Sequence, residues 1–165
     1  MTVKQTFTDI ELSELVDLAA EKQAAGYRCV NTHCVNGVDG VDIIYTFVVD
    51  GGDDVYENYR VKNVPHKSHI PSIQGSFPGV FPFENETQDL YGLTVDGMLL
   101  DFHFNFYSTD MSEPMTVITP EKKAAMEKAA KIAKAKAAKA AKDAQAKAAA
   151  SAAPTMTQAE EGEDK

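Results

Sequence analysis

The sequence predicts a two-layer α+β domain followed by a helical extension. Three observations support this fold class: an amphipathic helix pattern near the start of the chain, strand-like runs separated by turn residues after it, and an abrupt change to alanine and lysine beyond residue 120. A helix and a sheet with one apolar face each pack as two layers around one core. The chain of 165 residues, 44% of them apolar, has room for one such core.

Composition divides the chain into three parts. We expect a folded domain over residues 1–113, an Ala/Lys-rich helical extension over 114–153 and a disordered acidic tail over 154–165. The first part carries 6 basic and 18 acidic residues, a net charge of −12, whereas the remainder carries 10 and 7, a net charge of +3. An acidic domain repels nucleic acid phosphates and favours a basic protein partner.

The extension is expected to be a solvated helix. Residues 121–153 contain 9 basic and 3 acidic side chains, with no aromatic residue among the lysines and only a weak apolar face. This pattern favours neither DNA binding nor deep membrane insertion. Contact with anionic lipid headgroups or with an acidic partner is the alternative.

The first expected element of the domain is a helix over residues 8–25. Its apolar residues recur mostly at three- and four-residue steps. Thr8 is a candidate N-cap, with Glu11 completing a capping box, and Gly26 can adopt the left-handed conformation that ends a helix.

Three strands are expected next, over residues 27–35, 41–49 and 55–61. They are rich in β-branched and aromatic residues, and turns of Asn, Asp and Gly join them into an antiparallel meander. In the first strand, Cys29 and Cys34 are five residues apart, so strand alternation predicts opposite faces and reduced, buried thiols rather than a disulfide.

A proline-rich loop is expected over residues 64–82, because proline excludes both a helix and a central strand. A short helix should begin near Pro82 and end at Gly92. A short strand at 93–95 and a longer one at 99–107 should follow, the latter with its phenylalanines on one face.

No catalytic site or cofactor is predicted on this chain. A zinc site could draw on a group of cysteines and histidines, but their spacing does not match structural zinc patterns; the group is Cys29, His33, Cys34, His66 and His69. The sequence contains no nucleophile elbow, phosphate-binding glycine loop or dinucleotide fingerprint. Two cysteines are too few to hold a cubane iron–sulfur cluster alone.

One stretch carries a distinctive motif. It reads Ile-Pro-Ser-Ile at 70–73, Phe-Pro-Gly-Val-Phe-Pro-Phe at 77–83 and Glu-Asn-Glu-Thr-Gln-Asp-Leu-Tyr-Gly-Leu at 84–93. This resembles the signature of the C-subunit family of NADH dehydrogenase (respiratory complex I): Pro-Ser, then Glu-Arg-Glu, two residues, Asp, two residues and Gly. The matching residues are Glu84, Glu86, Asp89 and Gly92.

Two departures refine the resemblance. Asn85 stands where complex I members usually have arginine, and residues 96–100 lack the Gly-His-Pro and arginine pair that follow in those members. The chain is therefore more similar to the short members of the family, above all to the small D-type subunit of energy-converting, Ech-type nickel-iron hydrogenase.

The resemblance implies a non-catalytic accessory subunit of a membrane-associated, ferredoxin-linked hydrogenase. The nickel-iron centre and the iron–sulfur clusters would lie in partner subunits, namely the hydrogenase large subunit and the iron–sulfur small subunit. The chain would be cytoplasmic and peripheral to the inner membrane, which it would contact only through the complex, and no nucleic acid partner is expected. The alternatives are a stand-alone interaction or assembly module without a redox role and, more weakly, a small metal-binding protein.

The expected partner interface consists of Glu84, Glu86, Asp89 and Gly92. Three carboxylates within six positions of a short helix concentrate negative charge that can accept bidentate hydrogen bonds from arginine. Glu86 and Asp89 share a helix face while Glu84 lies on another, so the pair is the expected contact. The alternative is that these acids are solvated charges or charges near the helix N-terminus that the helix dipole favours.

Overall fold

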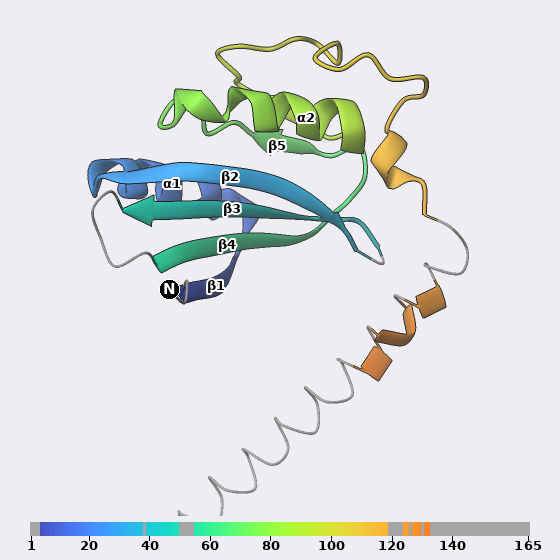
Figure 1. Ribbon diagram of the computed structural model, residues 1–165, viewed down its shortest axis with the longest axis horizontal. Coiled ribbons are helices and arrows are strands. Elements are labelled where there is room, and N and C mark those ends of the chain that lie inside the picture. The colour runs from blue at the N-terminus through green and yellow to red at the C-terminus, as the bar shows by residue number, and fades with distance from the viewer. Residues whose placement is uncertain are drawn as a thin grey trace, which may run out of the picture. The chain divides into compact units, whose positions relative to one another are not determined.

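The computed structural model of the chain (Figure 1) describes residues 4–37, 39–49, 55–118, 124, 125, 127–129, 131 and 132. The chain divides into two compact units, Met1–Lys123 and Ala124–Lys165. In the second unit the described residues are helical, as their composition predicts. The rest of the predicted extension and the predicted disordered tail lie outside the described residues.

The first unit has the predicted α+β fold, built on a four-stranded mixed sheet in the order β1-β4-β3-β2. The predicted antiparallel meander is confirmed as β2 (Tyr27–Asn36), β3 (Val41–Val49) and β4 (Val55–Val64). The sequence did not predict β1 (Lys4–Ile10), which pairs in parallel with β4. Its side chains are almost all exposed, so no apolar alternation marks it as a strand.

The first helix starts later than predicted. Thr8 is not its N-cap, because Thr8 lies in β1 opposite Tyr59. A 3-10 turn η1 (Leu12–Glu14) leads instead into α1 (Leu15–Ala24), and the side chains of Glu11 and Glu14 form the capping box. The predicted end is confirmed, since Gly26 takes the left-handed conformation with φ +78°.

The second half of the unit contains β5 (His69–Pro71), η2 (Pro78–Val80), α2 (Phe81–Tyr91), β6 (Thr94–Asp96) and η3 (Pro114–Thr116). The predicted short helix is confirmed as α2, which ends at Gly92 with φ +67°. Strands β5 and β6 pair in parallel. In Figure 1, α2 runs beside β2 with β5 below it, and the yellow segment that follows β6 passes over the outer side of α2.

The predicted strand over residues 99–107 is wrong. This stretch is irregular, and two consecutive residues in it, His103 and Phe104, take left-handed φ values of 51° and 59°. Such conformations are incompatible with a strand. The alternating phenylalanines imitate the two-residue period of a strand in a segment that is not in a sheet.

The predicted placement of the two cysteines on opposite faces is also wrong. A bulge between Cys29 and Asn31 adds one residue to β2, so Cys29 lies opposite Phe47 and Cys34 opposite Ile43. Both partners belong to the hydrophobic core, which both cysteines contact. Both thiols are free, and burial raises the pKa of each to about 11.

A polar cluster joins α1 to the sheet. The Lys22 ammonium lies 2.6 Å from the Glu57 carboxylate, which also accepts hydrogen bonds from the hydroxyls of Tyr27 at 2.8 Å and Tyr59 at 2.9 Å. The ammonium also lies 4.3 Å from the centroid of the Tyr27 ring. Burial lowers the pKa of Lys22, but the interactions with Glu57 and Tyr59 together outweigh that effect, and the pKa lies above its ordinary value.

Among the described residues, no helix is both long enough and apolar enough to span a membrane.

Candidate partner interface

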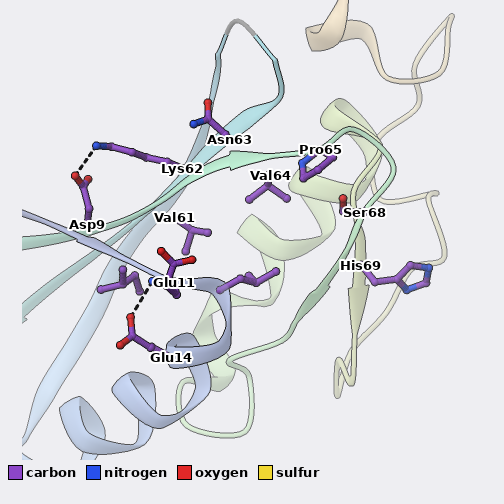
Figure 2. Close-up of a pocket in the computed structure, with 12 residues that line it drawn as sticks. Asp9, Glu11, Glu14, Val61, Lys62, Asn63, Val64, Pro65, Ser68 and His69 are labelled. Carbon is purple, nitrogen blue, oxygen red and sulfur yellow. Dashed lines mark hydrogen bonds and ion pairs between the residues drawn. The ribbon is translucent and has the colours of Figure 1, made fainter. Parts of the chain in front are cut away.

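The first hollow in the domain, of about 370 Å³, lies where the parallel strands β1 and β4 end and the chain turns away from each (Figure 2). Figure 2 shows Lys62 reaching Asp9, and Glu11 facing Glu14 in the capping box. His69 pairs with a carboxylate of β6. Each of these polar groups thus has a partner within the domain: Lys62 pairs with Asp9, the Glu11 N–H donates to Glu14, and His69 pairs with Asp96.

A second hollow, of about 510 Å³, lies between the start of β2 and η2. Its lining is largely aromatic and aliphatic, and it includes the thiol of Cys29 and the hydroxyl of Ser76. Because burial raises the pKa of Cys29 to about 11, the unreactive thiol predominates at neutral pH. Across the described residues, no three His, Cys, Asp or Glu side chains are grouped so that they could hold a metal ion.

The densest polar chemistry lies on α2. Buried polar side chains are costly unless they form hydrogen bonds. On this helix they occupy almost consecutive positions: Glu84, Asn85, Thr87, Gln88 and Asp89. Their hydrogen bonds show what the signature motif does inside the domain.

Glu84 fastens the loop that follows β5. Its Oε2 accepts hydrogen bonds from the Ser72 hydroxyl at 2.7 Å and the Gln74 amide at 2.9 Å, and its Oε1 accepts one from the Ile73 N–H at 2.8 Å. Burial raises the pKa of Glu84, although these three bonds act in the opposite direction. Only 2% of Glu84 is exposed, so the geometry favours a role inside the domain for this predicted interface residue.

Two amide side chains hold the irregular segment after β6. Gln74 Oε1 accepts hydrogen bonds from the N–H groups of Leu99 and Leu100, both at 2.9 Å. Asn85 donates to the Leu100 carbonyl at 3.0 Å and accepts from the Phe102 N–H at 2.8 Å. The asparagine that departs from the usual arginine of complex I members is therefore fully buried and binds backbone.

Gln88 completes this support from the next turn of α2. Its Oε1 accepts the Val95 N–H at 3.0 Å, and its Nε2 donates to Asp101 at 3.0 Å. The N–H groups of Leu99, Leu100 and Phe102 thus donate to side chains rather than to a neighbouring strand. The roles of Gln74, Asn85 and Gln88 were not predicted from the sequence. The available signal in the sequence was that Asn85 and Gln88 are three residues apart on a short helix, so that their polar side chains lie on one face and could bond to a neighbouring segment.

Asp89 and Glu86 both accept hydrogen bonds from Tyr107, which agrees with their predicted shared face of the helix. Asp89 Oδ2 accepts the Tyr107 N–H at 2.6 Å, and the Tyr107 hydroxyl donates to Glu86 at 3.3 Å. The Glu86 charge is the main cause of a raised pKa at Tyr107. Asp89 is only 6% exposed, and its Oδ1 has no hydrogen-bond partner among the described residues.

Gly92 provides room as well as a helix cap. A β-carbon at this position would lie 2.5 Å from Cγ and 2.7 Å from Oε1 of Glu113, and closer still to its Cδ. Glu113 immediately precedes η3, which packs on α2. Gly92 therefore allows the end of the following segment to return to the helix, and contact between Gly92 and a partner stays a prediction.

The segment that α2 holds in place carries a run of exposed apolar side chains. Between 40% and 71% of each residue's surface is exposed. We call this run the 99–117 strip; it consists of Leu99, Leu100, Phe102, Phe104, Tyr107, Met111, Met115 and Val117. Concentrations of exposed apolar residues on a soluble domain mark interaction surfaces.

Comparison with known proteins gives this surface a family context. The family model described as "Respiratory-chain NADH dehydrogenase, 30 Kd subunit" matches residues 7–115, which include α2 and most of the 99–117 strip. A search of curated protein sequences gave no match.

A similar fold occurs in a solved structure described as "Structure of the membrane-bound sulfane sulfur reductase (MBS), an archaeal respiratory membrane complex". The similarity to one of its chains has a TM-score of 0.50 at 13% sequence identity, and it covers 67% of this chain and 66% of that chain. At this identity the similarity establishes a shared fold over about two thirds of each chain.

Proposed function

This chain belongs to the family of the 30 kDa subunit of the respiratory-chain NADH dehydrogenase, and from that membership we propose that it is a structural subunit of a complex I-related membrane assembly. Its task is to bind a neighbouring subunit and hold it in place. The match over residues 7–115 supports this, because it contains the signature helix α2 and the segment that α2 supports.

The 99–117 strip is the structural feature that supports a binding role for this subunit. Fully burying a Leu or Phe side chain contributes about 1.5–3 kcal/mol, and the strip residues still have 40–71% of their surface to bury, so together they offset part of the cost of association. Hydrogen bonds with the side chains of Gln74, Asn85 and Gln88 already hold the start of the strip in the isolated chain. A surface ordered before binding loses less conformational entropy when a partner covers it.

The assembly we propose is an energy-converting nickel-iron hydrogenase linked to ferredoxin. Asn85 and the sequence at 96–100, which lacks the arginine pair, favour this type over complex I itself. The partners would be the hydrogenase large subunit, which carries the nickel-iron centre, and the small subunit, which carries iron–sulfur clusters. The chain would lie on the cytoplasmic side and reach the membrane through these partners. The structure with a similar fold is described as a respiratory membrane complex, which agrees with an assembly of this general kind.

Co-purification from native membranes tests the proposal. The full chain is tagged, and the proteins recovered with it are identified by mass spectrometry. We expect the hydrogenase large subunit and the iron–sulfur small subunit with the wild-type chain. Recovery of the chain alone, without any subunit of a complex I-related enzyme, would contradict the proposal and favour a stand-alone interaction module.

Two variants assign the binding to the strip. In the double variant Leu99→Asp/Phe104→Asp, two exposed side chains become charged, while the backbone hydrogen bond that Leu99 makes is retained. Phe7→Asp is the matched control, because Phe7 is a 60% exposed apolar residue on β1, outside the strip. We expect the double variant to fold and to lose its partner, and the control to retain it. Equal recovery of the partner by both variants would exclude the strip.

A further inference from the structure

We propose that Glu86 and Asp89 form a binding site for the guanidinium group of an arginine that belongs to the partner subunit. This inference rests on the proposed function and specifies the chemistry of one contact at the 99–117 strip. The two carboxylates lie on one face of α2 and share the contact with Tyr107, which is itself a member of the strip.

The Asp89 carboxylate is only half satisfied within the domain. Asp89 is 6% exposed, and its Oδ1 has no hydrogen-bond partner among the described residues, whereas its Oδ2 accepts the Tyr107 N–H at 2.6 Å. By contrast, both oxygens of the buried Glu84 accept hydrogen bonds within the domain. A buried carboxylate oxygen without a donor is destabilising, so a donor supplied by a partner adds to the affinity.

A second carboxylate adds negative charge beside that oxygen. Glu86 stands one helical turn before Asp89, is partly exposed, and has a long contact of 3.3 Å with the Tyr107 hydroxyl. Four basic side chains of the domain pair with other acids: Lys22 with Glu57, Arg60 and Lys62 with Asp9, and Lys67 with Glu113. The pair is therefore a concentration of negative charge at the strip.

The geometry favours a guanidinium group over other cations. Its planar fork of five N–H donors can bond two carboxylates at once, whereas a lysine ammonium acts as a point charge. A divalent metal ion requires more ligands, and the described residues contain no group of three or more His, Cys, Asp or Glu side chains placed to hold one.

The position of the site couples it to the strip. The backbone of Tyr107 lies against the Asp89 carboxylate and donates its N–H to Oδ2, so a guanidinium that bonds to Asp89 also lies next to a member of the strip. A partner that buries the strip also excludes water from the site, which strengthens the interaction between opposite charges.

Arginine-specific labelling of the assembled complex tests this inference. Complexes containing the full-length wild-type chain, Asp89→Asn or Glu86→Gln are isolated from membranes at low salt and treated with phenylglyoxal. Mass spectrometry then measures the labelling of each partner arginine. We expect one arginine to be protected in the wild-type complex and to react roughly tenfold more in both variants, as expected for loss of one charge-assisted hydrogen bond.

Asp17→Asn is the control, because it removes an exposed carboxylate from α1. Its complex should show the wild-type labelling. Tyrosine fluorescence and thermal unfolding of each purified chain establish that the variants fold. Since Glu86 is only partly buried, Glu86→Gln keeps the test valid if Asp89→Asn does not fold.

Two results would overturn the inference and leave the proposed function intact. One is an assembled wild-type complex in which no partner arginine depends on Glu86 or Asp89. The other is a partner lysine that is protected at this position from an amine-specific reagent. If the wild-type chain recovers no partner at all, the proposed function and the guanidinium site both fail.

Discussion

Replacing Gly92 by alanine tests how closely the segment that ends at η3 packs against α2. A non-glycine residue in the left-handed conformation costs about 1–2 kcal/mol, and Gly92 has φ +67°. The new β-carbon would also displace the Glu113 side chain, from whose Cγ it would lie only 2.5 Å away, and overpacking of this kind costs about 1–3 kcal/mol. Reduced entropy of the unfolded chain offsets about 0.4–1 kcal/mol. The expected loss in the free energy of unfolding is therefore about 2–4 kcal/mol.

Measuring Gly92→Ala in a Glu113→Ala variant separates the cost of the left-handed conformation from the cost of overpacking against Glu113. With Glu113→Ala already present, the β-carbon no longer meets a long side chain, and Gly92→Ala should cost only about 1 kcal/mol. The coupling energy of the double-mutant cycle should then be about 1–3 kcal/mol. This value measures the contact between Gly92 and Glu113 alone.

Urea unfolding of the full chain, followed by tyrosine fluorescence, provides the measurement. All six tyrosines lie between residues 27 and 107, and the chain has no tryptophan. The fluorescence therefore reports on the folded α+β domain and not on the alanine-rich extension. Midpoints should shift without a change in the m value. An equal cost of Gly92→Ala in both backgrounds would refute the predicted packing of Glu113 on Gly92.

The remaining predictions concern stability and thiol reactivity. Glu57→Gln should destabilise the protein by about 1–2 kcal/mol at neutral pH, because Lys22 loses its charged partner. Hydrogen bonds to Lys22 and the tyrosines lower the pKa of Glu57 despite its burial. Its contribution is therefore present above about pH 4.3 and is lost as the pH falls through the folded-state pKa, so urea midpoints of wild type and variant should converge in acid. Glu84→Gln should lower the free energy of unfolding by about 1–3 kcal/mol at acidic pH, because the NH₂ group of the new amide would face the donors that now bond to Glu84. The pKa of Glu84 is raised by burial, so wild-type stability should fall as the pH rises from about 4.3 through the folded-state value, and the variant should lack this slope in the same titration. Cys29 and Cys34 have pKa values of about 11 and should react with a disulfide reagent at pH 8 at least about a hundredfold more slowly than in urea; rapid labelling of the folded chain would show that the thiols are not buried as described.

The features that were predictable from the sequence depend on local chemistry. The meander follows from β-branched residues between turn residues, and the bounds of α2 follow from Pro82 near its start and Gly92 at its end. The shared face of Glu86 and Asp89 follows from helix periodicity and is confirmed by their common contact with Tyr107.

The errors arise where distant residues determine the local structure. β1 has no apolar face and exists through its pairing with β4, about fifty residues later in the chain. One inserted residue in β2 brings Cys29 and Cys34 to the same core, and the alternation rule cannot anticipate it. At residues 99–102 the backbone bonds to Gln74 and to amides of α2 rather than to a strand, so an alternating apolar pattern gave the wrong element.

The candidate site was only partly predictable for the same physical reason. The acids of the motif were identified, but the burial of Glu84 depends on a loop ten to twelve residues earlier in the chain. The exposed strip was missed because its phenylalanines were assigned to a sheet face. An interface presented by an irregular segment has no sequence period that would reveal it.

Oxidative footprinting of the methionines tests whether a partner subunit covers the 99–117 strip. Met111 and Met115 are 53% and 50% exposed in the chain, whereas Met98 packs against the core. We expect hydrogen peroxide to oxidise Met111 and Met115 readily in the purified chain and at least about tenfold more slowly in the complex isolated from membranes, as is usual when accessible side chains become buried. Met98 should be protected in both samples. Equal oxidation of Met111 and Met115 in the free chain and in the assembled complex would contradict a covered strip.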